Sequence, residues 1–192
     1  FFAVNNVKKN NWQRNNFIGN NIKNKTIGII GHGRIGKKLE IYSKVLGMKV
    51  LIFEKKKNQK KNNFVTMRNL LKNSDIVSLN INYNENLYKY FNYKYFKLMK
   101  KNSLFINTSR GELVSENCLI KALNNKIISG AALDVLSDQQ IGKKIKNKKI
   151  YNYLKNNDNL IITPHIGGAT HESFRIVKDY TLNLCKKILS KK

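Results

Sequence analysis

The sequence predicts an α/β protein, in which the strands of a parallel sheet alternate with helices that cover both faces in a doubly wound arrangement. Two observations predict this fold class. Short apolar runs of strand length recur along the chain, and between them lie segments whose apolar residues recur at helical spacing. The 192 residues are enough for one substantial core.

Six segments are predicted as strands because each is a short apolar run. They are residues 25–31, 49–54, 75–81, 103–108, 129–135 and 160–163. Helices are predicted at residues 35–46, 65–72, 87–91, 93–99 and 115–124. Gly47 ends the first of these helices, and Ser115 caps the one at 115–124. Residues 139–157 are predicted as a long polar loop, and a last amphipathic helix runs from Thr170 to the end.

The charge of the chain has two explanations. There are 37 Lys and Arg against 11 Asp and Glu, a formal net charge of +26, which would attract polyanions. The favoured residue types, Lys, Asn, Ile, Tyr and Phe, are those that AT-rich codons encode, so codon drift is the preferred explanation. Denser lysine clusters at 55–61 and 143–149 keep a polyanion-binding surface as the alternative. The aromatic residues of 85–100 are expected in the core rather than in a nucleic-acid-binding stripe.

Several features predict a soluble, cytoplasmic protein. No apolar run approaches the ~20 residues of a membrane helix, and the opening Phe-Phe-Ala-Val has no secretory pattern. Because it lacks Met, we expect the sequence to begin inside a longer polypeptide. Cys118 and Cys185 match no disulfide or metal-ligand spacing, and the three histidines have no carboxylate cluster, so no metal site is predicted.

A glycine-rich turn joins the first strand to the first helix. The sequence Gly31-His32-Gly33-Arg34-Ile35-Gly36 is G-x-G-x-x-G in the strand–turn–helix context of Rossmann-type dinucleotide-binding folds. Gly31 permits the tight turn, Gly33 lets the backbone approach a pyrophosphate, and Gly36 lets helix and strand pack closely. The helix N-terminus then holds the anion. His32 is expected to face solvent.

An acidic residue follows at the distance that this fold requires. Glu54 closes the second strand, 18 residues after Gly36 (54 − 36 = 18). A carboxylate there accepts hydrogen bonds from the adenosine ribose hydroxyls and repels a 2′-phosphate. Glu54 therefore favours NAD over NADP, unless it is merely a surface carboxylate. The lysines that follow it could accommodate a phosphate.

Two polar segments follow later strands. Arg110 comes after the strand at 103–108, and His165 comes after the strand at 160–163. In open parallel sheets, ligands bind beyond the carboxyl ends of the strands, so both residues should face the cofactor cleft. Arg110 can hold a carboxylate through two hydrogen bonds, and His165 can exchange a proton near neutral pH. Each taken alone could instead be an ordinary surface residue.

Together these segments resemble the NAD-binding domain of the D-isomer-specific 2-hydroxyacid dehydrogenases, which include phosphoglycerate, lactate and formate dehydrogenases. The resemblance runs through KTIGIIGHGRIG, Glu54, SDIVSLNI, LMKKNSLFINTSRGELVSENCLIKAL, SGAALDV and NLIITPHIGGAT. It implies hydride transfer between NAD and a D-2-hydroxy acid or 2-keto acid, with a phosphoglycerate-like substrate among the candidates. We also expect a homodimer, although the sequence leaves the oligomeric state open.

The resemblance assigns roles to individual residues. Arg110 would bind the substrate carboxylate and polarise the adjacent carbonyl, and His165 would give or take the hydroxyl proton. Asp134 would hold the nicotinamide carboxamide. The cofactor-binding residues implied are Gly31, Gly33, Arg34, Ile35, Gly36, Glu54, Ile81, Thr108, Ser109, Asp134, His165, Gly167 and Gly168.

One departure concerns the partner of the histidine. The family usually has a glutamate five residues after the aspartate of ALDV; here that position is Gln139, a third catalytic candidate, with Asp138 beside it. A glutamine resembles the formate dehydrogenase branch. Whether Gln139 or Asp138 takes the place of the glutamate stays open.

The other departure concerns domain organisation, because the substrate domain of the family would lie outside this chain. Residues 1–24 are interpreted as the end of an interdomain helix and a lead-in, 25–169 as the dinucleotide-binding domain, and 170–192 as a helix that returns to the substrate domain. Two other functions remain as alternatives: a degenerate relative that senses NAD without turnover, and a protein that binds nucleic acid or another polyanion through its lysines.

Overall fold

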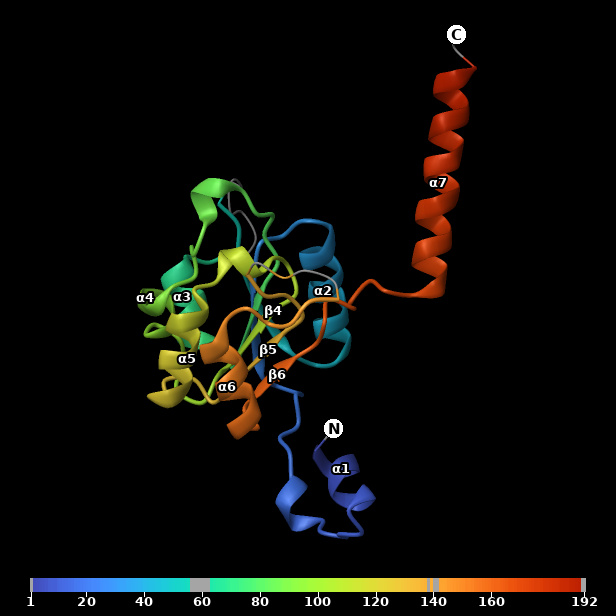
Figure 1. Ribbon diagram of the computed structural model, residues 1–192. Helices are drawn as coiled ribbons and strands as arrows, with labels where there is room; N and C mark the ends of the chain where they lie inside the picture. The colour runs from blue at the N-terminus through green and yellow to red at the C-terminus, as the bar shows by residue number, and fades with distance from the viewer. Residues whose placement is uncertain (1, 56–62, 138, 140–141, 191–192) are drawn as a thin grey trace.

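The computed structural model describes residues 2–55, 63–137, 139 and 142–190, in which six strands form one parallel sheet (Figure 1). The strands are β1 (Thr26–Ile30), β2 (Lys49–Phe53), β3 (Ile76–Leu79), β4 (Leu104–Asn107), β5 (Gly130–Leu133) and β6 (Leu160–Ile162). Their order across the sheet is β2-β1-β3-β4-β5-β6. All six predicted strands are present, and the predicted α/β fold class is confirmed.

The register of the sheet aligns the carboxyl ends of all six strands. Neighbouring strands pair their last residues with one another in a continuous row. The row runs Phe53, Ile30, Leu79, Asn107, Leu133, Ile162. The chain leaves β1 toward β2 on one side and later returns to β3 on the other side. The crevice at this change of direction is where open α/β sheets bind ligands.

Seven helices accompany the strands within the described ranges. They are α1 (Phe2–Lys8), α2 (Arg34–Val45), α3 (Met67–Asn73), α4 (Tyr93–Phe96), α5 (Glu116–Asn124), α6 (Lys148–Asn156) and α7 (His171–Leu189). Short 3-10 turns occupy Asn15–Phe17, Glu85–Leu87 and Gly111–Leu113. In Figure 1, α2 lies on one side of the sheet, whereas α3, α4, α5 and α6 lie on the other.

The two faces of the sheet bury separate cores. The larger core lies under α3 to α6 and contains the aromatic residues Phe91, Phe96 and Phe105, all fully buried. The smaller core joins β1 and β2 to Leu39 of α2. Phe91 and Phe96 confirm the expectation that the aromatic residues of 85–100 lie in the core, whereas for Tyr88, which is 52% exposed, the expectation is wrong.

The prediction of a continuous loop at 139–157 is wrong, because α6 lies within it. Asn147 begins the helix by accepting hydrogen bonds from the backbone N–H groups of Lys149 and Ile150. Ile150 and Tyr153, three residues apart, are buried on one side of it. The many Lys and Asn residues around them concealed this short apolar period.

Two smaller expectations are also wrong. The helix predicted at 87–91 is replaced by a 3-10 turn that ends at Leu87, because Phe91 pairs with the segment around Val114. The helix predicted at 93–99 ends at Phe96. Ser115 precedes α5 as expected, but its side chain makes no capping hydrogen bond.

The terminal helices extend away from the sheet (Figure 1). Apolar side chains of α7, including Phe174, Val177 and Tyr180, are more than half exposed. His171 is exposed, as expected. In the described part of the chain, we find no helix with the length and apolar character needed to cross a membrane.

Candidate functional site at the carboxyl edge of the sheet

The three glycines of the loop after β1 have different surroundings. Gly31 has a φ of +93°, and a Cβ there would lie 2.6 Å from the carbonyl oxygen of Asn80. At Gly36 a Cβ would lie 2.2 Å from the carbonyl oxygen of Gly31. At Gly33, by contrast, it would meet nothing within 4 Å. Gly31 and Gly36 are therefore required by the fold, whereas the space over Gly33 is free for a ligand beside the N-terminus of α2.

Glu54 lies next to this loop. It follows the last residue of β2, and its Oε2 accepts a hydrogen bond from the backbone N–H of His32 at 2.9 Å. The carboxylate is therefore held at the edge of the glycine loop, where a ribose attached to a bound pyrophosphate would lie. This position fits the role inferred from the spacing.

His32 does not face solvent, and that expectation is wrong. Only 9% of its side chain is exposed, and its Nε2 lies 2.7 Å from Oε2 of Glu40. The ring also packs edge-on against Phe64, with 5.3 Å between the ring centroids. The ring turns inward because its two partners, Glu40 of α2 and Phe64 of the segment after β2, lie on that side.

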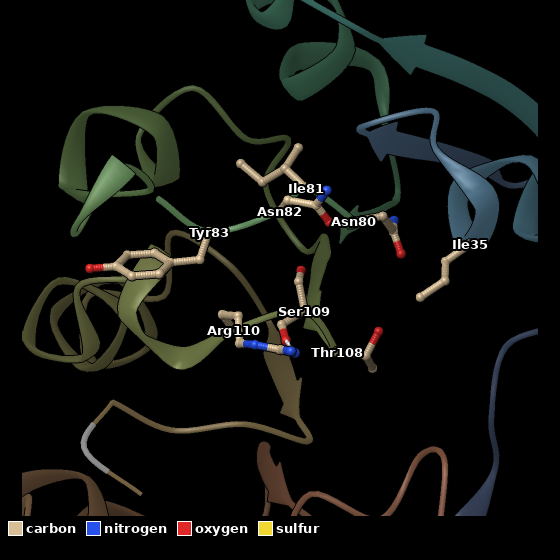
Figure 2. A pocket seen from close by; sticks show the side chains of 8 residues that line it. All are labelled: Ile35, Asn80, Ile81, Asn82, Tyr83, Thr108, Ser109 and Arg110. Atoms are coloured by element: carbon tan, nitrogen blue, oxygen red, sulfur yellow. Dashed lines mark hydrogen bonds between the residues drawn. The ribbon is translucent and has the colours of Figure 1, made fainter. Parts of the chain in front are cut away.

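A cleft of about 390 Å³ opens beside the loop, between the ends of β1, β3 and β4 (Figure 2). Its lining residues are Ile35, Asn80, Ile81, Asn82, Tyr83, Thr108, Ser109 and Arg110. In Figure 2 the guanidinium of Arg110 extends toward the side where Thr108 and Ile35 lie, whereas the ring of Tyr83 points the other way. The structure thus brings four of the predicted cofactor-binding residues into one cleft with Arg110.

The turn that carries Arg110 is fixed by a buried amide. Asn107, the last residue of β4, accepts a hydrogen bond from the N–H of Ser109 at 3.0 Å and donates one to the carbonyl of Arg110 at 2.9 Å. The hydroxyl of Ser109 donates to the carbonyl of Leu79 at 2.6 Å. The Arg110 side chain is exposed and has no carboxylate partner among the described residues, so it can bind an acid.

Asp134 organises the loop that carries His165. Its Oδ1 accepts hydrogen bonds from the Thr163 hydroxyl at 2.5 Å and the Ile166 N–H at 3.0 Å, and its Oδ2 accepts one from Gly167 N–H at 2.9 Å. Burial would raise the pKa of Asp134, but these hydrogen bonds and nearby His165 outweigh burial and hold the pKa below its ordinary value. Asp134 is therefore a carboxylate that ties this loop to the end of β5.

His165 is held in an unusual conformation beside Gln139. Its φ is +57°, in the left-handed region, and its N–H donates to the carbonyl of Thr163 at 3.0 Å. Its Nδ1 meets the amide nitrogen of Gln139, whose Oε1 accepts the N–H of Leu136 at 2.9 Å. Gln139 thus stands beside the histidine; Asp138 lies outside the described residues.

A second hollow, of about 560 Å³, lies beside His165 and Gln139. It is lined by Gln139 and His165, among other residues, and Arg110 does not line it. Gly111, the residue after Arg110, packs against Leu136, since a Cβ there would lie 1.9 Å from the carbonyl carbon of Leu136. This close contact fixes the Arg110 turn against the segment that carries Gln139.

Comparisons with known proteins decide the family. The model of the D-isomer specific 2-hydroxyacid dehydrogenase, NAD binding domain, matches residues 2–167. The chain belongs to this family. The glyoxylate reductase of Thermococcus litoralis is 38% identical over 167 residues, which are 84% of this chain and 48% of that enzyme. This chain of the dehydrogenase family therefore spans about half the length of that relative.

Solved structures show the same relationship. D-lactate dehydrogenase from Aquifex aeolicus, complexed with NAD and lactic acid, is 31% identical and superposes with a TM-score of 0.86 over 99% of this chain and 61% of that one. An acyclic imino acid reductase in complex with NADPH and D-Arg is 30% identical, with a TM-score of 0.83 over 100% of this chain and 60% of that one. NAD is the cofactor that characterises the domain family.

Sequence reasoning missed three polar residues of this dehydrogenase domain. Asn107 fixes the Arg110 turn, and Glu40 holds His32. Buried Glu116 accepts hydrogen bonds from the N–H of Ser137 at 2.8 Å and the side-chain amide of Asn147 at 2.5 Å, beside Gln139. The position of Asn107 at the end of an apolar strand was a usable signal. Nothing in the local sequence indicated Glu40 or Glu116.

Proposed function

We propose that the protein containing this chain transfers a hydride between NAD and a D-2-hydroxy acid or its 2-keto acid. The aligned ends of the six strands carry this proposal. The residues that directly follow them form one row at the carboxyl edge: Glu54, Gly31, Asn80, Thr108, Asp134 and Thr163. A dinucleotide laid along such a row would have its adenosine end at Glu54 and its nicotinamide end beside Arg110 and His165.

Each polar residue has a chemical part in this reaction. Bound NAD supplies or accepts the hydride. Arg110 would bind the substrate carboxylate through two N–H groups and place a third donor near the carbonyl oxygen. His165 would give that oxygen a proton during reduction and take it back during oxidation. Asp134 would act on the carboxamide and through the loop that it holds.

The Gln139 amide determines which nitrogen of His165 carries the proton. Because Oε1 of Gln139 accepts the Leu136 N–H, its Nε2 faces His165 and donates. The Nδ1 of His165 must then offer its lone pair, so the neutral ring carries its proton on Nε2. In this neutral form the Nε2–H can donate a hydrogen bond to a substrate oxygen, whereas transfer of a proton to that oxygen requires the doubly protonated ring.

Glu54 supports a preference for NAD over NADP. Its carboxylate is fixed by the His32 N–H, and a 2′-phosphate placed there would meet a like charge. The imino acid reductase that is similar to this chain was solved with NADPH, so the preference needs its own test. Calorimetric titration of the chain with both cofactors supplies it. Equal or tighter binding of NADPH would contradict the Glu54 argument.

The test of the reaction uses the protein that contains this chain. We expect NADH-dependent reduction of a 2-keto acid to the D-2-hydroxy acid. Arg110→Ala should weaken substrate affinity and turnover together, since one guanidinium anchors the carboxylate and polarises the carbonyl. His165→Asn should keep NADH binding and lower turnover by ~10²–10⁴-fold. If His165→Asn leaves turnover unchanged, His165 is not the acid–base group.

We further propose a cytoplasmic homodimer whose domains divide at residues 24 and 169. Free cysteines Cys118 and Cys185 suit a reducing compartment.

Exposed apolar side chains at the C-terminal end of α2 support self-association. Ile41, Tyr42, Val45 and the following Leu46 are each more than half exposed. Light scattering should report a dimer that Val45→Glu weakens; a monomer at all concentrations would contradict it. The exposed apolar side chains of α7 support its return to a substrate domain.

The comparisons do not support either of the other two hypotheses, the NAD sensor and the polyanion-binding protein.

A further inference from the structure

A partly buried cluster of charged and polar side chains lies beside the glycine loop, and the proposed reaction does not use it. The exposed fractions of the His32 and Glu40 side chains are 9% and 17%, and they meet at 2.7 Å. The other carboxylate oxygen of Glu40 accepts hydrogen bonds from Lys44 at 2.7 Å and from the Asn63 amide at 2.9 Å. The hydrogen bonds of Glu40 thus join three parts of the chain: the glycine loop, α2 and the segment after β2.

The segment after β2 is anchored beside the same cluster. The carbonyl of Asn63 accepts the N–H of Ile52 at 2.8 Å, and the N–H of Val65 donates to the carbonyl of Ile52 at 2.8 Å. These bonds place Phe64 against the edge of the His32 ring. His32 is therefore held between a carboxylate and an aromatic ring and cannot rotate without losing both contacts.

The anchored ring belongs to the residue that positions Glu54. The backbone N–H of His32 donates to Oε2 of Glu54 at 2.9 Å. A backbone rotation at His32 large enough to redirect its N–H would also carry the ring away from Glu40 and Phe64, so these two contacts oppose it. The Glu40–His32 contact therefore acts, through that peptide, on the carboxylate proposed to receive the adenosine ribose.

One buried polar atom of the cluster has no hydrogen-bond partner among the described residues. Burial raises the pKa of Glu40, but hydrogen bonds from Lys44 and His32 lower it further, so Glu40 is a carboxylate that only accepts hydrogen bonds. The Nε2 of His32 must then carry a proton, and its buried Nδ1 has no partner among the described residues. An unpaired buried polar atom disfavours folding. Residues that oppose stability in this way are expected at functional sites.

We propose that His32 and Glu40 are positioning residues for cofactor selection: by fixing the glycine-loop N–H and Glu54, they set the affinity for NADH and its preference over NADPH. This inference rests on the proposed function, because it requires that Glu54 receives the adenosine ribose.

The test is His32→Leu in the 192-residue chain, titrated with NADH and NADPH by calorimetry. NADH affinity should fall about tenfold, because a displaced Glu54 would lose its hydrogen bond with the ribose, and about tenfold is the size expected when a hydrogen bond to a charged group is lost. NADPH affinity should fall less, so that the ratio of the two affinities shrinks. The ratio of the two affinities is the decisive measurement, because loss of a purely structural contact would weaken the binding of both cofactors alike. An unchanged ratio would overturn the proposal.

Further variants keep the test decisive if His32→Leu fails to fold. His32→Gln, which retains a donor for Glu40, should restore most of the selectivity. Glu40→Ala should reproduce the loss, and adding His32→Leu to it should cost little more, since both remove the same contact. Lys44→Ala, which removes only the more exposed partner of Glu40, should leave the ratio unchanged. A wild-type chain that binds no NADH would overturn the proposed function as well; wild-type binding with Glu40→Ala at the wild-type ratio would overturn this inference alone.

Discussion

Gly33 precedes α2 and Gly36 lies in its first turn, three residues further on, yet a side chain at each would meet different surroundings. A Cβ at Gly36 would overlap the carbonyl of Gly31, whereas the space at Gly33 is empty. We expect Gly33→Ala to retain stability and to lose about 10- to 100-fold in NADH affinity, because its methyl group occupies the path of the pyrophosphate. Fluorescence titration with NADH and thermal unfolding measure the two quantities.

The matched control is Gly36→Ala, which should lower the free energy of unfolding by ~1–3 kcal/mol through overpacking. If Gly33→Ala binds NADH as the wild-type chain does, the loop does not hold the pyrophosphate.

Gln139 gives a second prediction at the scale of single residues. In the wild-type protein the Gln139 amide donates to Nδ1 of His165, and a second proton on that ring would place two N–H groups against each other. Gln139→Glu would offer an acceptor and a negative charge instead, which stabilise the doubly protonated ring. We expect keto acid reduction, which consumes a proton, to persist to higher pH in Gln139→Glu. A pH profile of turnover that does not move would show that residue 139 does not act on His165.

Among the loops that follow the strands, the one after β6 depends on a single carboxylate. The folded state holds the pKa of Asp134 below its ordinary value of 3.8, so Asp134 stabilises the fold above that pH. This contribution is lost as the pH falls from about 4 through the lower folded-state pKa, where the carboxylate protonates and the bonds from Thr163, Ile166 and Gly167 weaken.

We therefore expect amide exchange at Ile166 and Gly167 to accelerate in the wild-type chain below about pH 4. Asp134→Asn should show fast exchange at both amides from neutral pH downward, with a smaller dependence on pH. Equal exchange in the two proteins at pH 7 would contradict this account of the loop.

At the scale of the whole molecule, the charge of +26 gives a prediction about nucleic acids. If codon drift produced it, any DNA binding should be independent of sequence. It should also weaken steeply between ~50 mM and ~200 mM salt, since only counterion release drives it. Fluorescence anisotropy with two unrelated duplexes at both salt concentrations measures this. Selective binding of one duplex at the higher concentration would support a selected polyanion-binding surface.

The sequence alone determined the fold class, the six strands and the glycine loop, because these depend on residues close together in the chain. Apolar runs and a G-x-G-x-x-G motif report local backbone requirements, which is why the strands and the backbone positions that require Gly31 and Gly36 could be predicted. Short helices were harder to predict. In α6 only Ile150 and Tyr153 are buried, and the lysines around them gave the segment the composition of a loop.

Only the tertiary structure decided which groups meet across long separations. Glu40 and Phe64 turn the His32 ring inward, although they follow it by 8 and 32 residues. The partners of Asp134 lie 29 to 33 residues further along the chain. Whether a polar side chain faces solvent or a buried partner depends on which strands become neighbours, and the parallel order β2-β1-β3-β4-β5-β6 establishes those neighbours only once the whole sheet has formed.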